Sequence, residues 1–224
     1  MTNARINARI TGVFFILGTV PPIASGILWG SIVSSPDYLS GMAAHGVPVL
    51  LLALSNMLFL GLACAGIGIS LYPVLKPHGE VLALGAMGFR LIEGAIQIVG
   101  AIVLVALLAL RREFVKAGSP PDSFFQPAAA AIKSVRDWAA NGSAVFPWCA
   151  GAYIYYAIFF RTRLVPRWLS IWGLLGLTLF LVSAFAVMFG LISSFSKIQM
   201  LLSLPILVQE LALALWLIVK GYKE

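Results

Sequence analysis

A single carboxylate, Glu210, lies at the midpoint of an apolar run, residues 201–219, that contains no other charged residue. Placing a carboxylate at the centre of a bilayer costs about 2.5–3.5 kcal/mol on insertion scales, so such residues usually face a bundle interior and have a polar partner. Gln209 lies directly before it. The two residues therefore predict a buried polar centre.

Partners for this carboxylate come from another apolar run, residues 80–110, which carries Arg90, Glu93 and Gln97. Spacings of three and four residues place these side chains on one face of a helix. Arg90 and Glu210 both lie roughly 15 Å from the expected inner ends of their helices, at the rise of an α-helix. We therefore expect an Arg90–Glu210 ion pair within a ligand-binding or ion-pair centre formed by these five residues.

Three interpretations of this centre remain open. If the helix enters lipid only at Leu91, Arg90 and Glu93 are interfacial and extend toward the headgroups. A buried ion pair can also be purely structural and determine which helices meet. A ligand, proton or ion role is the third interpretation, since charges within a membrane commonly mark functional sites.

The chain lacks familiar patterns for metal or nucleophilic catalysis. His45 and His78 are its two histidines, and they flank one apolar run on opposite membrane faces, so they are not expected to share a metal ion or haem. The sequence has neither the zinc-protease motif nor the serine nucleophile motif. Cys64 and Cys149 are isolated in apolar runs and are expected to be buried small hydrophobes. We predict no catalytic residue, metal or cofactor.

Composition indicates that the bilayer is the solvent of this chain. Hydrophobic residues make up 61% of its 224 residues and charged residues 10%, whereas soluble domains contain about 25% charged residues. The net charge is +7, but the basic residues cluster at the ends of apolar runs. There they mark the cytoplasmic side or contact anionic lipid. The expected partner is thus the lipid bilayer and not nucleic acid.

Six apolar runs are long enough to cross a membrane as helices, which need about 20 residues each. These runs are continuous, whereas strands of a membrane barrel alternate in polarity. Arg5 and Arg9 precede the first run as in a signal peptide, but its length favours an uncleaved helix. We predict an all-α, polytopic transmembrane bundle of six helices in a single domain, residues 1–224. The expected spans are residues 9–33, 47–75, 80–110, 142–161, 166–190 and 199–220.

Orientation follows from the basic residues between the spans. With the N-terminus inside, eight lie on the inner side and six on the outer side, which favours cytoplasmic N- and C-termini in the cell (inner) membrane. Arg111 and Arg112, directly after the third span, argue against this orientation. The inner set is Arg5, Arg9, Lys76, Arg161, Arg163, Arg167, Lys220 and Lys223, and the outer set is Arg111, Arg112, Lys116, Lys133, Arg136 and Lys197.

The long connection between the third and fourth spans predicts one further helix. Over residues 128–140, Ile132, Val135 and Trp138 fall on one side, and charged residues fall elsewhere. This pattern is typical of a short amphipathic interfacial helix on the outer membrane surface. A solvated linker is the alternative. Within the spans, glycines supply small faces for close helix packing, namely Gly61 with Ala65, Gly85 with Gly88, and Gly173 with Gly176.

Several of these segments resemble a bacterial membrane family described as domain of unknown function 4386. The resemblance covers nearly the whole chain, and the block around Pro166 is its most specific part. It implies a polytopic integral membrane protein and carries no activity or cofactor. The segments that carry it are residues 8–12 (ARITG), 90–93 (RLIE), 164–173 (LVPRWLSIWG) and 205–222, with Gln209, Glu210 and a WLIVKGY ending.

Three functions follow as expectations, in order of preference. The first is a non-enzymatic protein that binds a hydrophobic, lipid-like ligand or serves as an accessory subunit of a membrane-protein partner. The second is a small transporter or proton-linked carrier built around Arg90, Glu93 and Glu210. The third and least favoured is an intramembrane enzyme.

Overall fold

A computed structural model describes residues 3–33, 46–118, 120, 123–193 and 196–223, and these residues contain helices and no strand. The all-α prediction is confirmed for this part of the chain. His45 lies outside it. The α-helices are α1 (Asn3–Val33), α3 (Gly46–Ser55), α4 (Leu62–Leu75), α5 (Glu80–Lys116), α6 (Phe125–Trp138), α7 (Val145–Thr162), α8 (Arg167–Met188) and α9 (Lys197–Val219).

Five helices of the described residues are long and apolar enough to cross a membrane: Ala4–Ala24, Gly46–His78, Glu80–Lys116, Arg167–Met188 and Lys197–Val219. The fourth expected span, residues 142–161, coincides with α7, which is not among these five helices. The tyrosines of α7 and its Pro147 and Trp148 make it less apolar. Because half of its residues are buried against other helices, α7 has little need for a lipid-compatible surface on those faces.

Two π-helical segments interrupt the long helices. The segment η1 (Asn56–Gly61) joins α3 to α4, and η3 (Ala139–Ser143) joins α6 to α7. Hydrophobic periodicity did not predict either segment, because a single wide turn changes the pattern by only one residue. The short 3₁₀ segment η2 (Lys76–His78) and Gly79, with φ of 149°, form a tight turn before α5.

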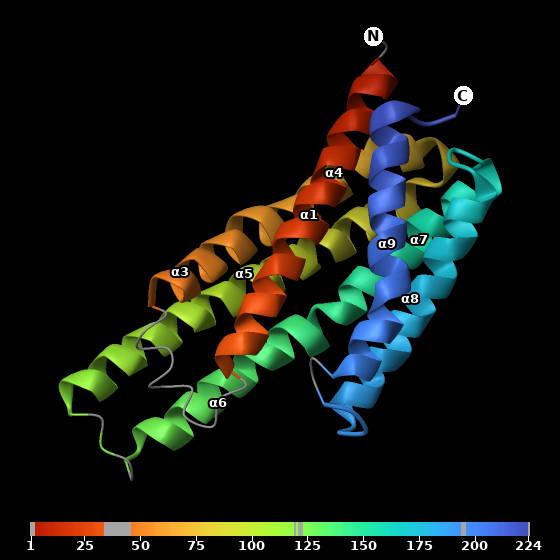
Figure 1. The fold of residues 1–224 in the computed structure, drawn as a ribbon. Coiled ribbons are helices and arrows are strands. Elements are labelled where there is room, and N and C mark those ends of the chain that lie inside the picture. Colours follow the sequence, from red (N-terminus) through yellow and green to blue (C-terminus); the bar gives the residue numbers. More distant parts are fainter. Residues whose placement is uncertain (1–2, 34–45, 119, 121–122, 194–195, 224) are drawn as a thin grey trace.

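The helices form a bundle with an arm. In the bundle, α1 packs along α9, α8 along α9, and α5 against both α4 and α7. Figure 1 shows both termini at the same end of this bundle, while α3, the C-terminal half of α5 and α6 extend away from α8 and α9. We call these three segments the arm. A second apolar cluster, separate from the bundle core, holds the arm together through Leu52, Leu104, Leu107, Phe114 and Phe125.

The structure contains the predicted amphipathic helix as α6, and this helix packs against other helices of the protein. Phe125 and Ala129 of α6 are buried, and α6 packs along α5 and continues through η3 into α7. It is therefore not a solvated linker. Lys133 and Asp137 form an ion pair at 2.9 Å on its polar side, while Trp138 remains half exposed. Its position at a membrane surface stays a prediction.

Glycines allow the closest helix contacts. A Cβ built on Gly94 of α5 would lie 2.5 Å from the carbonyl oxygen of Gly61, so α5 and η1 approach backbone to backbone. A Cβ on Gly176 of α8 would lie 3.0 Å from the backbone nitrogen of Ile206. Gly61 and Gly176 thus serve the role expected of them. Gly88 does not, since a Cβ there would meet no atom within 4 Å.

These contacts predict opposite effects of two alanine substitutions on one helix. Gly94→Ala forces the α5 and η1 backbones apart and should lower the free energy of unfolding by about 1–3 kcal/mol. Gly88→Ala meets open space and should leave stability unchanged or raise it by up to about 1 kcal/mol, because alanine favours helix. Reversible unfolding in mixed detergent micelles measures both. Equal effects at the two positions would contradict the packing described.

A buried charged centre

Four of the five residues predicted to form the polar centre are buried together inside the bundle. The exposed fractions are 3% for Arg90, 5% for Glu93, 6% for Glu210 and 0% for Gln209. Gln97, one turn beyond Glu93 on α5, is only half-buried. Arg90 and Glu93 are not interfacial residues reaching toward headgroups, because their side chains are enclosed by neighbouring helices.

The ion pair of Arg90 is formed within its own helix. Its Nη1 lies 2.9 Å from Oε2 of Glu93, three residues further along α5. The expected direct Arg90–Glu210 pair is wrong: within the described part of the chain, Arg90 makes its salt bridge with Glu93. Arg90 and Glu210 do lie within electrostatic range of one another, as their equal depth in the membrane predicted. Glu93 nevertheless forms the ion pair, because it lies three residues from Arg90 on the same helix face.

Small residues on two helices make room for the arginine. A Cβ on Gly68 of α4 would lie 3.0 Å from the Cβ of Arg90, and a Cβ on Gly151 of α7 would lie 3.5 Å from its Cγ. The aliphatic part of the Arg90 side chain therefore runs between α4 and α7, and its closest contact is with Gly68. Such close contacts are common where membrane helices pack.

Glu210 is held by α1. The hydroxyl of Thr19 donates a 2.9 Å hydrogen bond to its Oε2, and the Thr19 side chain is itself buried. Trp148 of α7 also lies within interaction distance of this carboxyl group. Thr19 was not predicted as a site residue. A buried hydroxyl within the apolar α1 is the sequence signal that could have identified it.

A second set of hydrogen bonds anchors α9 beside the charged residues. The Gln209 amide donates to the carbonyl oxygen of Leu169 at 2.9 Å, and the Tyr156 hydroxyl donates to Gln209 Oε1 at 2.5 Å. The Tyr156 ring fits over Gly173, where an added Cβ would lie 2.6 Å from the ring. Tyr156 thus combines helix packing with a buried hydrogen bond.

Several buried polar atoms in this centre have no hydrogen-bond partner among the described residues. They are Nε and Nη1 of Arg90, Oε2 of Glu93 and the hydroxyl of Tyr155. The 2.9 Å contact of Arg90 with Glu93 is therefore an ion pair without the alignment of a hydrogen bond. About 90% or more of buried polar groups in proteins are hydrogen-bonded. The centre thus retains unused donors and acceptors.

The described residues contain no group of three histidine, cysteine, aspartate or glutamate side chains placed to hold a metal ion. Cys64 and Cys149 are buried and not disulfide-bonded, as expected, and Cys64 lies beside Glu93. The geometry offers one guanidinium, two carboxyl groups and a set of hydroxyls enclosed by apolar helices. Such a set can hold charge or a proton.

Substitution of Arg90 tests whether the Arg90–Glu93 ion pair stabilises the folded protein. Arg90→Met leaves Glu93 buried without its counter-ion and should lower the free energy of unfolding by about 3–5 kcal/mol. Lys116→Met is the matched control, because Lys116 and Glu113 form an ion pair at 2.7 Å with the same spacing on the same helix, but exposed. Its loss should have little measurable effect. Similar results for the two variants in detergent unfolding would contradict burial of the Arg90–Glu93 pair.

Comparison with known proteins places this architecture in a family. A family model with the description "Domain of unknown function (DUF4386)" matches residues 10–221, which include most of α1, every later helix and the whole charged centre. No curated protein and no solved structure matches the chain. Together with the apolar helices, this match shows a multi-pass membrane protein of unknown function. The chain belongs to the DUF4386 family.

Proposed function

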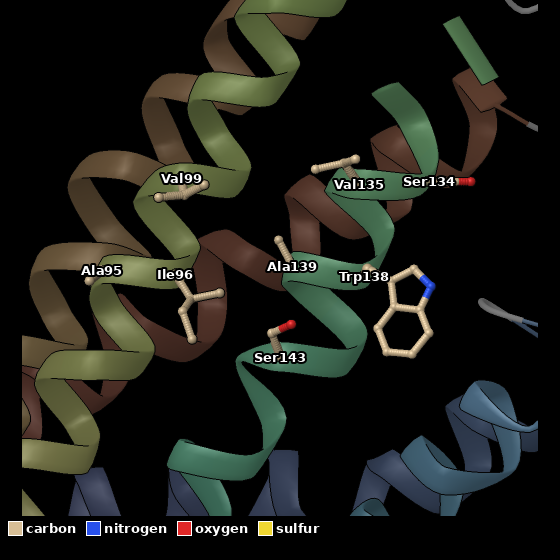
Figure 2. Close-up of a pocket in the computed structure, with 8 residues that line it drawn as sticks. All are labelled: Ala95, Ile96, Val99, Ser134, Val135, Trp138, Ala139 and Ser143. Carbon is tan, nitrogen blue, oxygen red and sulfur yellow. The ribbon is translucent and has the colours of Figure 1, made fainter. Parts of the chain in front are cut away.

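We propose that this membrane protein binds a hydrophobic, lipid-like ligand in a groove between α5 and the α6–η3 segment. The observation that carries the proposal is a groove of about 520 Å³, within the range of about 300–1,000 Å³ common for ligand sites. Figure 2 shows the residues that line it: Ala95, Ile96, Val99, Ser134, Val135, Trp138, Ala139 and Ser143.

The side chains that line the groove indicate which class of ligand it could bind. Alkyl and aromatic groups dominate it, and Ser134, Ser143 and the indole nitrogen of Trp138 are its polar side-chain groups. Its α5 wall, Ala95 to Val99, lies at the middle of an apolar helix long enough to cross a membrane. A single acyl chain suits an apolar groove at that position, because it buries hydrocarbon and requires no hydrogen bonds.

The wide turn of η3 shapes one wall of the groove. Ala139 and Ser143 both belong to η3, and Ala139 packs toward Gly100 of α5. Trp138 lies against Gly142, where an added Cβ would be 2.7 Å from the indole ring. Figure 2 shows the Trp138 ring on the side of α6–η3 that faces away from α5.

The membrane arrangement belongs to the same proposal. We take α7 as a sixth span, with both termini on the cytoplasmic side of the inner membrane and α6 near the outer surface. The two ends of the chain lie together, which supports an even number of membrane crossings. The Tyr222 hydroxyl donates a hydrogen bond to the Thr11 hydroxyl at 3.3 Å, and the backbone N–H of Lys223 donates to the carbonyl oxygen of Leu164 at 2.8 Å. Figure 1 shows the two termini at one end of the bundle.

A photoactivatable fatty acid in reconstituted vesicles tests the groove. Labelling should concentrate on residues 95–99 and 134–143. Ala95→Trp should reduce labelling there several-fold, because the larger ring occupies the groove. Ala106→Trp is the matched control, since Ala106 is also exposed on α5 but does not line the groove. Uniform labelling of all exposed apolar faces, or no difference between the two variants, would contradict a specific lipid site.

A proton-linked carrier is the second candidate function, and one observation favours it. Two buried carboxyl groups, Glu93 and Glu210, lie within electrostatic range of one buried guanidinium, that of Arg90, which forms its ion pair with Glu93. Membrane carriers commonly place ionisable groups in this way.

Proteoliposomes with an internal pH-sensitive dye test the carrier. An imposed proton gradient should dissipate faster with the protein than without it. Glu210→Gln should abolish the difference, and Glu113→Gln should preserve it, because Glu113 is exposed near the end of α5. Equal dissipation with and without the wild-type protein would refute transport of protons themselves.

A further inference from the structure

The geometry points to Glu210 as a proton-binding site whose carboxyl group is neutral at neutral pH, beside an ionised Arg90–Glu93 pair. This inference goes beyond the lipid groove. It deepens the second candidate function by naming the proton as the bound species, and it rests on that function only for its use in transport. It follows from charge balance and the identity of the nearest partners.

Charge balance requires one neutral carboxyl group. The Arg90 guanidinium can compensate one carboxylate, and both Glu93 and Glu210 are at least nine-tenths buried. An isolated carboxylate in an apolar interior is costly, and a buried acid avoids that cost by taking up a proton. With two ionised carboxylates the centre would carry an excess negative charge, and with one bound proton it is neutral.

The contacts of the two acids identify which one holds the proton. Glu93 lies 2.9 Å from Arg90 Nη1, so its carboxylate is compensated. Glu210 forms no salt bridge with any residue that the structure describes. Its side-chain neighbours in hydrogen-bonding range, Thr19 and Trp148, are both uncharged donors.

Other ionisable groups near Glu210 do not supply a compensating charge. On α7 and α4 these groups are thiols and phenols, which are neutral at neutral pH. On α8 the charged residue is Arg167, at the first residue of the helix and against Phe160. The groups within electrostatic range of Glu210 are Cys64 on α4, Arg90 and Glu93 on α5, and Cys149, Tyr155 and Tyr156 on α7.

Infrared spectroscopy of the purified full-length protein in lipid nanodiscs tests the inference directly. The spectrum at neutral pH should contain the C=O stretch of a protonated carboxylic acid. Glu210→Gln should remove this band, and Glu113→Gln should retain it. Absence of the band in the wild type, or its persistence in Glu210→Gln, would overturn the assignment.

Thermal unfolding provides a second readout that separates the two buried acids. Glutamine resembles protonated glutamate in shape and charge, so Glu210→Gln should leave the unfolding midpoint at neutral pH close to that of the wild type. Glu93→Gln should lower the midpoint clearly, because it leaves Arg90 without its counter-ion. The reverse order would show that Glu93 holds the proton. A chain with the band but without proton flux would contradict only the carrier function.

Discussion

The architecture depends on neutralising one guanidinium inside an apolar bundle. Arg90 cannot lose its charge, so the chain supplies Glu93 one turn away and two glycines, Gly68 and Gly151, that let α4 and α7 enclose the pair. The same centre brings α1 and α9 into contact through Thr19 and Glu210. Polar contacts thus specify which helices meet, in a surrounding where hydrophobic packing alone discriminates weakly between helix faces.

The helices themselves were largely predictable, since continuous apolar runs allow few alternatives in a bilayer. The apolar run of residues 80–110 predicted α5, and that of residues 199–220 predicted α9. The predicted and observed ends agree within about two residues, except that α5 continues to Lys116. Composition could not predict how the charged groups pair. Arg90 had two carboxylates at compatible depth, and only the packing of five helices determines which is nearest. Tyr156 and Thr19 were missed for the same reason, because a polar atom in an apolar helix does not reveal its partner.

Helix α5 connects the two proposed sites. Arg90 and Glu93 face the bundle core, and Ile96 and Val99 on the same helix line the lipid groove. The centre and the groove are therefore separated by about one turn of a single helix. A small rotation of α5 that changed the Arg90–Glu93 geometry would also change the shape of the groove. The proposed acyl-chain site and the proposed proton site therefore have α5 in common.

The two π-helical segments lie where the arm joins the bundle, η1 between α3 and α4 and η3 between α6 and α7. A π-helical turn contains one residue more than an α-helical turn, and such turns occur frequently at functional sites. Helix α5 crosses the same boundary without interruption. The arm is therefore joined to the bundle by two wide turns and by one uninterrupted helix, so α5 is the one regular α-helical connection between them among the described residues.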